Sequence, residues 1–248
     1  AGLSRGLGDV YKRQVSGFTK NLLIGANLLL TPFLFGQETN DMEGWSSIEL
    51  DVKANKNLSF SVSEHLRYRN DITTLKNYFT QAKVQYELFK NFEIGAGIRY
   101  ITNNDDTGNI QGYEPLFRYQ FDAVFSDKID EVTVLFRLRY QNKNELGFSE
   151  SEGDIPVEYT RYRIGFDYRI KALKLNAKLF GEVFNEAKTT DSNGGFNRHR
   201  YTLRISRKFK NFGTVAMFYA NQSDYSTNTK KNKSIIGFKY SYRLNLSK

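Results

Sequence analysis

A two-residue alternation of apolar and charged side chains through Glu158–Ile170 constrains the fold of this chain more than any other feature. Tyr162 and Phe166 share one parity, whereas Arg161 and Arg163 share the other. Successive side chains of a β-strand point to opposite faces, so the pattern predicts a strand between two environments. A soluble core would not accept unpaired arginines. A strand of a transmembrane barrel, apolar toward lipid and polar toward the lumen, satisfies both faces.

The same alternation recurs along the chain between turns and loops rich in Gly, Asn and Asp. It predicts eleven strands, most of them long enough to cross ~30 Å of hydrocarbon when tilted. The pattern of Thr214–Gln222 is too weak to assign its two faces. The predicted strands are Gly44–Ala54, Leu58–Asn70, Asn77–Phe89, Phe92–Thr102, Pro115–Phe125, Val132–Gln141, Glu158–Ile170, Leu173–Phe184, Arg198–Phe209, Thr214–Gln222 and Lys233–Leu246.

These strands predict an all-β fold, a transmembrane antiparallel up-and-down β-barrel of 10–12 strands preceded by a signal peptide. From the second strand on, short and long connections alternate, and in such barrels short turns face the periplasm. By this rule the second to eleventh strands form an even barrel, and the first begins on the wrong side. Either the first strand is a lumen or periplasmic segment, or a twelfth strand lies near Glu38–Trp45. A soluble β-sandwich with one wet face is the alternative fold.

The N-terminal segment does not share the strand pattern. Residues 1–14 resemble nothing that follows, and we interpret them as a non-native artefact. Lys20 and the apolar run Asn21–Phe35 are typical of a signal peptide, whose hydrophobic region is too short to span a membrane. A buried core helix is the alternative. We therefore assign residues 15–37 to a signal peptide, residues 38–248 to a single barrel domain, and the protein to the outer membrane.

Composition excludes several classes of function. The chain has no cysteine, which excludes disulfides and thiolate chemistry. Its mean hydropathy of −0.56 excludes a polytopic helical membrane protein but permits a barrel. The formal net charge is +9, yet the basic residues alternate along strands instead of clustering, so we expect no nucleic-acid partner. Two histidines and no phosphate-binding loop leave no metal or cofactor site to predict.

Arginines on the polar parity gather toward the ends of strands that meet the long loops. We call ten of them the arginine belt and predict that they face the outer half of the lumen. A packed interior of arginine–carboxylate pairs is one interpretation, because long side chains fill small barrels and buried charges must be paired. An anion-favouring constriction or a small acidic ligand site is the other. The belt comprises Arg67, Arg69, Arg99, Arg118, Arg137, Arg139, Arg161, Arg163, Arg198 and Arg200.

Enzyme chemistry has one candidate pair. His65 and Ser63 lie two residues apart on one polar strand face, so they should be near each other, as in a Ser–His hydrolase. Such pairs are common by chance on polar strands. His199 lies on the apolar parity between Arg198 and Arg200. We therefore expect no catalytic residue and keep a lipid-modifying hydrolase as an alternative.

Several degenerate arginine–aromatic motifs recur along the predicted strands. They are GWSSIEL from Gly44, EHLRYR from Glu64, GAGIRY from Gly95, FRLRY from Phe136, RYRIGFDY from Arg161, EVFN from Glu182 and RHRYTLRI from Arg198. These motifs resemble those of domain-of-unknown-function family 2490, exported β-barrel-like proteins of Gram-negative bacteria. The resemblance covers nearly all of Gly44–Leu246 and implies an outer-membrane location, but no known reaction and no catalytic residue.

Together these features predict a monomeric outer-membrane barrel without cofactor, in contact with outer-membrane lipid. Its expected role is structural or that of a porin-like channel for small solutes, with a lumen that favours anions. The alternatives are the barrel hydrolase and, second, a periplasmic β-sheet binding protein.

Overall fold

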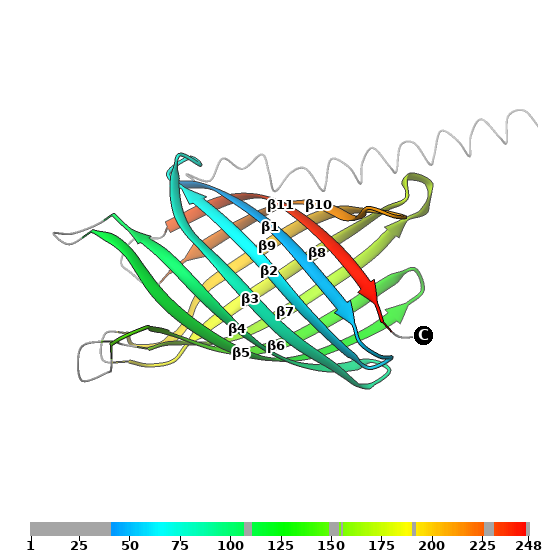
Figure 1. Ribbon diagram of the computed structural model, residues 1–248, viewed down its shortest axis with the longest axis horizontal. Coiled ribbons are helices and arrows are strands. Elements are labelled where there is room, and N and C mark those ends of the chain that lie inside the picture. Colours follow the sequence, from blue (N-terminus) through cyan, green and yellow to red (C-terminus); the bar gives the residue numbers. More distant parts are fainter. Residues whose placement is uncertain are drawn as a thin grey trace, which may run out of the picture. The chain divides into compact units, whose positions relative to one another are not determined.

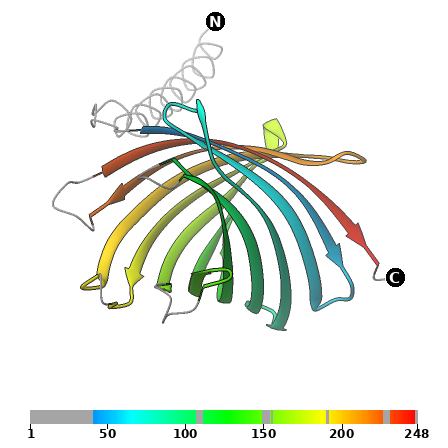
Figure 2. The ribbon, with the colours of Figure 1, turned by 60° about the vertical axis from the view of Figure 1, so that its left-hand side comes forward.

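The computed structural model describes residues 41–106, 111–148, 154, 156–189, 192–225 and 231–246. These residues form one closed barrel of eleven strands (Figures 1 and 2). The predicted all-β up-and-down barrel is therefore confirmed, whereas the predicted artefact and signal peptide lie outside the described residues. The strands are β1 (Asp41–Lys53), β2 (Leu58–Arg69), β3 (Thr74–Phe89), β4 (Phe92–Asp105), β5 (Gly112–Ile129), β6 (Val132–Glu145), β7 (Val157–Ile170), β8 (Leu175–Glu186), β9 (Gly195–Phe209), β10 (Gly213–Asp224) and β11 (Lys231–Asn245).

Each strand from β1 to β10 pairs antiparallel with the next strand in sequence. The barrel closes where β1 pairs parallel with β11, from Asp41 opposite Lys233 to Lys53 opposite Asn245. Figure 1 shows β1 between β11 and β2, running in the same direction as β11. Both expectations for the first strand were wrong, because β1 is a wall strand. A parallel pair also forms a full ladder of backbone hydrogen bonds, so closure does not require an even strand number.

The connections lie at two ends of the barrel, since consecutive strands are antiparallel. We call the end with the connections after β1, β3, β5, β7 and β9 the turn end. The connection after β7 contains the 3₁₀ turn η2 (Lys171–Leu173). The opposite end, which carries the longer connections after β4, β6, β8 and β10, is the loop end. No helix within the described ranges is long and apolar enough to cross a membrane.

The two faces of the strands differ as the alternation predicts. On β7, Tyr162 is 46% exposed on the outer wall, whereas Arg161 is 7% exposed inside. On β10, where the sequence did not assign the faces, the inner residues include Ala216 and Ala220, and Met217 is exposed outside. Both faces of β10 carry apolar side chains, and the two faces therefore show no contrast in polarity.

Two phenylalanines reach across to glycines on the neighbouring strand. Phe180 lies opposite Gly165, and Phe218 lies opposite Gly237. A Cβ atom at Gly237 would lie 1.9 Å from the Phe218 ring, and one at Gly165 would lie 2.6 Å from the Phe180 ring. Glycine at these positions lets each ring pack directly against the backbone of the neighbouring strand.

Gly237→Ala should therefore destabilise the barrel by about 1–3 kcal/mol, the usual range for overpacking. The matched control is Gly181→Ala on the outer wall, where a Cβ would meet its nearest neighbours at an ordinary 3.7 Å. Urea unfolding in detergent micelles measures both variants. Equal unfolding midpoints for the two would contradict the packing of Phe218 against Gly237.

Candidate functional site

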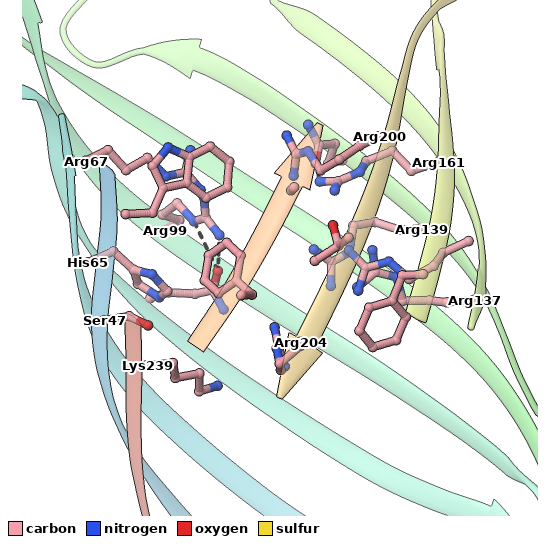
Figure 3. Close-up of a pocket in the computed structure, with 18 of the residues that line it drawn as sticks. Ser47, His65, Arg67, Arg99, Arg137, Arg139, Arg161, Arg200, Arg204 and Lys239 are labelled. Atoms are coloured by element: carbon pink, nitrogen blue, oxygen red, sulfur yellow. Dashed lines mark hydrogen bonds between the residues drawn. The ribbon is translucent and has the colours of Figure 1, made fainter. Parts of the chain in front are cut away.

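A cavity of 310 Å³ lies inside the barrel and is lined by side chains from all eleven strands. Among the described residues, ten arginines, two lysines and one carboxylate, Glu49, line it. Figure 3 shows Arg67 and Arg99 projecting from one side of this space and Arg161 and Arg200 from the other. The strand parity that places these residues inward also places their cationic groups in one shared chamber.

The structure places nine of the ten residues of the arginine belt in the lining of this cavity. Arg69 is the exception, because its Nη2 donates to the Asn104 carbonyl at 2.9 Å and forms a salt bridge with Asp106 at the loop end. Arg204, Lys83 and Lys239 also line the cavity and were missed. Arg204 has the same parity as Arg198 and Arg200, so the alternation along the strand could have identified it as a lumen residue.

One group of belt arginines is neutralised by carboxylates inside the barrel. Glu182 is 3% exposed and accepts hydrogen bonds from Arg161 at 2.8 Å and Arg163 at 3.0 Å, with Arg137 on its other oxygen. Asp122 accepts two hydrogen bonds from Arg139, at 2.5 and 2.8 Å. Such short charge-assisted pairs compensate for the loss of water around the buried charges.

A second group is held by neutral glutamines. Arg99 donates from Nε at 3.0 Å, and also from Nη2, to the side-chain oxygen of Gln81. In the same way Arg118 donates to Gln120 at 2.7 Å, and Arg200 donates to Gln222 at 2.9 Å. An amide oxygen orients a guanidinium without cancelling its charge. No salt bridge within the described part of the chain joins these arginines, or Arg67 and Arg204, to a carboxylate.

Aromatic rings support the same guanidinium groups. Arg67 lies 3.9 Å from the Trp45 ring centroid and 4.8 Å from that of Phe79, while Arg99 lies 3.9 Å from Phe79. Cation–π contacts of this kind are attractive and become stronger when water is excluded. Aromatic contacts also leave the positive charge unneutralised.

Three pairs of cavity arginines lie directly opposite one another across neighbouring strands. They are Arg99 with Arg118, Arg137 with Arg163, and Arg139 with Arg161. Like charges directly opposite in a sheet are destabilising. Glu182 and Asp122 relieve the last two pairs, whereas no described carboxylate forms a salt bridge with either member of the first.

The two histidines have different surroundings. Ser63 Oγ and His65 Nε2 lie 3.0 Å apart, so the predicted pair is within hydrogen-bond distance. His65 stacks on Phe79 with ring centroids 4.3 Å apart, and Ser63 is 2% exposed and does not line the cavity. His199 contacts the Tyr225 hydroxyl and lines an apolar depression around Gly181. In the ranges that the structure describes, no cluster of three or more His, Asp or Glu side chains could hold a metal.

Glu182→Gln should destabilise the barrel by about 3–5 kcal/mol, because it leaves three arginines in the lumen, of which Arg161 is buried, without their shared carboxylate. Glu131→Gln is the matched control, since Glu131 pairs with Lys171 in an exposed turn and should change little. Urea unfolding of both variants in micelles provides the comparison. A Glu182→Gln protein as stable as the parent would show that Glu182 does not neutralise this sector.

Comparison with known proteins and protein families assigns the chain to a family. No curated protein matches the chain. The model of the family described as "Protein of unknown function (DUF2490)" matches residues 42–233, which run from β1 into β11 and cover well over half of the sequence. The suspected resemblance is confirmed, and the chain belongs to this family.

Proposed function

We propose that this protein is an outer-membrane barrel whose lumen serves small solutes and favours anions. The observation that carries the proposal is the charge of the cavity lining, which among the described residues comprises ten arginines, two lysines and one glutamate. Rings of arginine or lysine select anions in pores, because they attract anions and repel cations within a narrow space of low dielectric constant.

The outer wall supports the membrane location. Every strand exposes at least one large apolar side chain on this wall. A soluble monomer rarely exposes an apolar surface that continues around the whole molecule. Lipid is the environment that suits this wall, so we favour the outer membrane over a soluble periplasmic binding protein. One such residue from each strand is Ile48, Val62, Tyr78, Ile98, Phe121, Phe136, Phe166, Leu179, Tyr201, Met217 and Phe238.

A purely structural barrel would use the same arginines only to fill its lumen. The sector around Glu182 fits that role, since three arginines share its carboxylate. The sector around Arg99 and Arg118 does not, because its positive charges are held by amides and aromatic rings. Unneutralised charge destabilises the fold, and an anion in the lumen would offset that cost.

Conductance across a planar lipid bilayer tests the proposal. In a KCl gradient we expect a steady current whose reversal potential has the sign of chloride permeation. Replacing both Arg99 and Arg118 by Gln should shift the reversal potential toward equal chloride and potassium permeability, because two charges leave the lining. This variant should still fold, because neither arginine forms a salt bridge with a described carboxylate and the change therefore leaves no carboxylate unpaired.

Arg169→Gln is the control for the conductance experiment, because Arg169 lies at the turn end of β7 and outside the cavity lining. It should leave the reversal potential unchanged. A folded barrel that carries no current, or one that prefers potassium, would contradict the channel.

A lipid-modifying hydrolase remains a second candidate on the strength of the Ser63–His65 contact. The described residues offer His65 no hydrogen-bonded carboxylate of the kind that orients a catalytic histidine. We therefore expect no fatty-acid release from phospholipid vesicles by the folded protein. Release that disappears in Ser63→Ala would reverse this preference.

A further inference from the structure

We propose that the cavity contains a discrete binding site for a small multivalent oxyanion of the phosphate type, centred on Arg67, Arg99 and Arg118. This inference deepens the proposed anion-favouring lumen and rests on it. All three residues line the cavity, from β2, β4 and β5. The site would therefore lie against one side of the lumen, away from the sector neutralised by Glu182.

Burial raises the electrostatic free energy of these positive charges. Arg99 and Arg118 are each 8% exposed and lie directly opposite each other in the β4–β5 register. Water can hydrate them only weakly, and each raises the electrostatic energy of the other. A bound anion between them would lower both costs at once.

A buried donor atom without an acceptor points to the same ligand. The Nε atom of Arg118 is buried and makes no hydrogen bond within the described residues. Arg118 is more than nine-tenths buried and lines the cavity. A buried donor without an acceptor is costly. A ligand with several oxygen atoms could supply acceptors where this chain does not.

The glutamines distinguish a binding site from a packed interior. Gln81, Gln120 and Gln222 hold Arg99, Arg118 and Arg200 at 2.7–3.0 Å while leaving their charges in place. Glutamate at these positions would make the same hydrogen bonds and neutralise the arginines, as Glu182 does across the lumen. The amides therefore favour an external anion over an internal one.

The geometry of guanidinium groups selects the class of anion. Their planar forks bind the paired oxygens of phosphates and carboxylates, whereas chloride offers a single acceptor centre. Arg67 and Arg99 on one side of the cavity face Arg161 and Arg200 on the other (Figure 3). A 310 Å³ chamber with cations on several sides suits a compact oxyanion with several charges, such as pyrophosphate.

The chain contains a built-in reporter for this site. Its single tryptophan, Trp45, lines the cavity, and the Arg67 guanidinium lies 3.9 Å from its ring centroid. Any anion that draws Arg67 toward it will change the surroundings of the indole. Tryptophan fluorescence of the folded, full-length barrel in neutral detergent therefore reports binding directly.

The test titrates sodium pyrophosphate at constant ionic strength, with sodium chloride as the matched salt. We expect a saturable fluorescence change with pyrophosphate, and none with chloride. Isothermal titration calorimetry on the same samples gives the affinity without relying on Trp45. A response that is identical for the two salts, or that never saturates, would overturn the site.

Gln81→Glu tests the neutral partner of Arg99. It should weaken pyrophosphate binding by ~10–100-fold, the loss expected when one charge-assisted contact is removed. Ser206→Glu is the control, because Ser206 shares the inward parity of Arg204 on β9 but does not line the cavity. Unchanged affinity in Gln81→Glu, or an equal loss in both variants, would overturn a local site.

Different results would rule out the anion-selective channel and the oxyanion-binding site. An anion-selective current from a protein without saturable pyrophosphate binding would leave the channel and remove the site. Saturable binding by a folded barrel that carries no current would remove the channel, and the same residues would then form a closed oxyanion-binding chamber.

Discussion

Closure of the sheet between β1 and β11 is the constraint on which the rest of the structure depends. In an apolar medium every backbone donor left at an open strand edge costs several kcal/mol, so a spanning sheet must close on itself. Here the parallel ladder from Asp41 to Lys53 pairs both edge strands over their shared length. Closure turns the inner faces of all eleven strands toward one lumen, and the arginines of distant segments become neighbours for that reason.

The charges in that lumen are unevenly distributed. Carboxylates gather near the arginines of β6 and β7, where Glu182 alone pairs with three of them. Glutamines and aromatic rings take the equivalent positions beside Arg67, Arg99 and Arg118. The cavity arginines of β6 and β7 are therefore paired with carboxylates, whereas Arg67, Arg99 and Arg118 form no salt bridge within the described residues. The packed-interior interpretation of the arginine belt fits the arginines paired with Glu182 and Asp122. We propose a role for anions only at Arg67, Arg99 and Arg118.

Much of the fold could be predicted from the sequence, because strand alternation is local. All eleven predicted strands are present, and Tyr162 and Arg161 lie on opposite faces. The parallel seam could not be predicted, since alternation identifies a strand without naming its partner. The inner and outer faces of β10 could not be assigned either, because an apolar residue, Phe218, points inward over Gly237. The alternation of side chains predicted which arginines face the lumen. It could not predict that Arg69 pairs with Asp106, because Asp106 lies in a loop, where the alternation ends.

Spin labelling tests whether lipid surrounds the apolar face of the barrel while the arginine face is enclosed. The chain has no cysteine, so single cysteines can be introduced at outward Tyr162, Phe166 and Met217 and at inward Thr202. In lipid vesicles, power-saturation electron paramagnetic resonance should show the three outward labels accessible to oxygen and shielded from a water-soluble nickel chelate. It should show the label at Thr202 shielded from lipid-dissolved oxygen. Outward labels that contact the nickel chelate as freely as labels on a soluble protein would contradict the account.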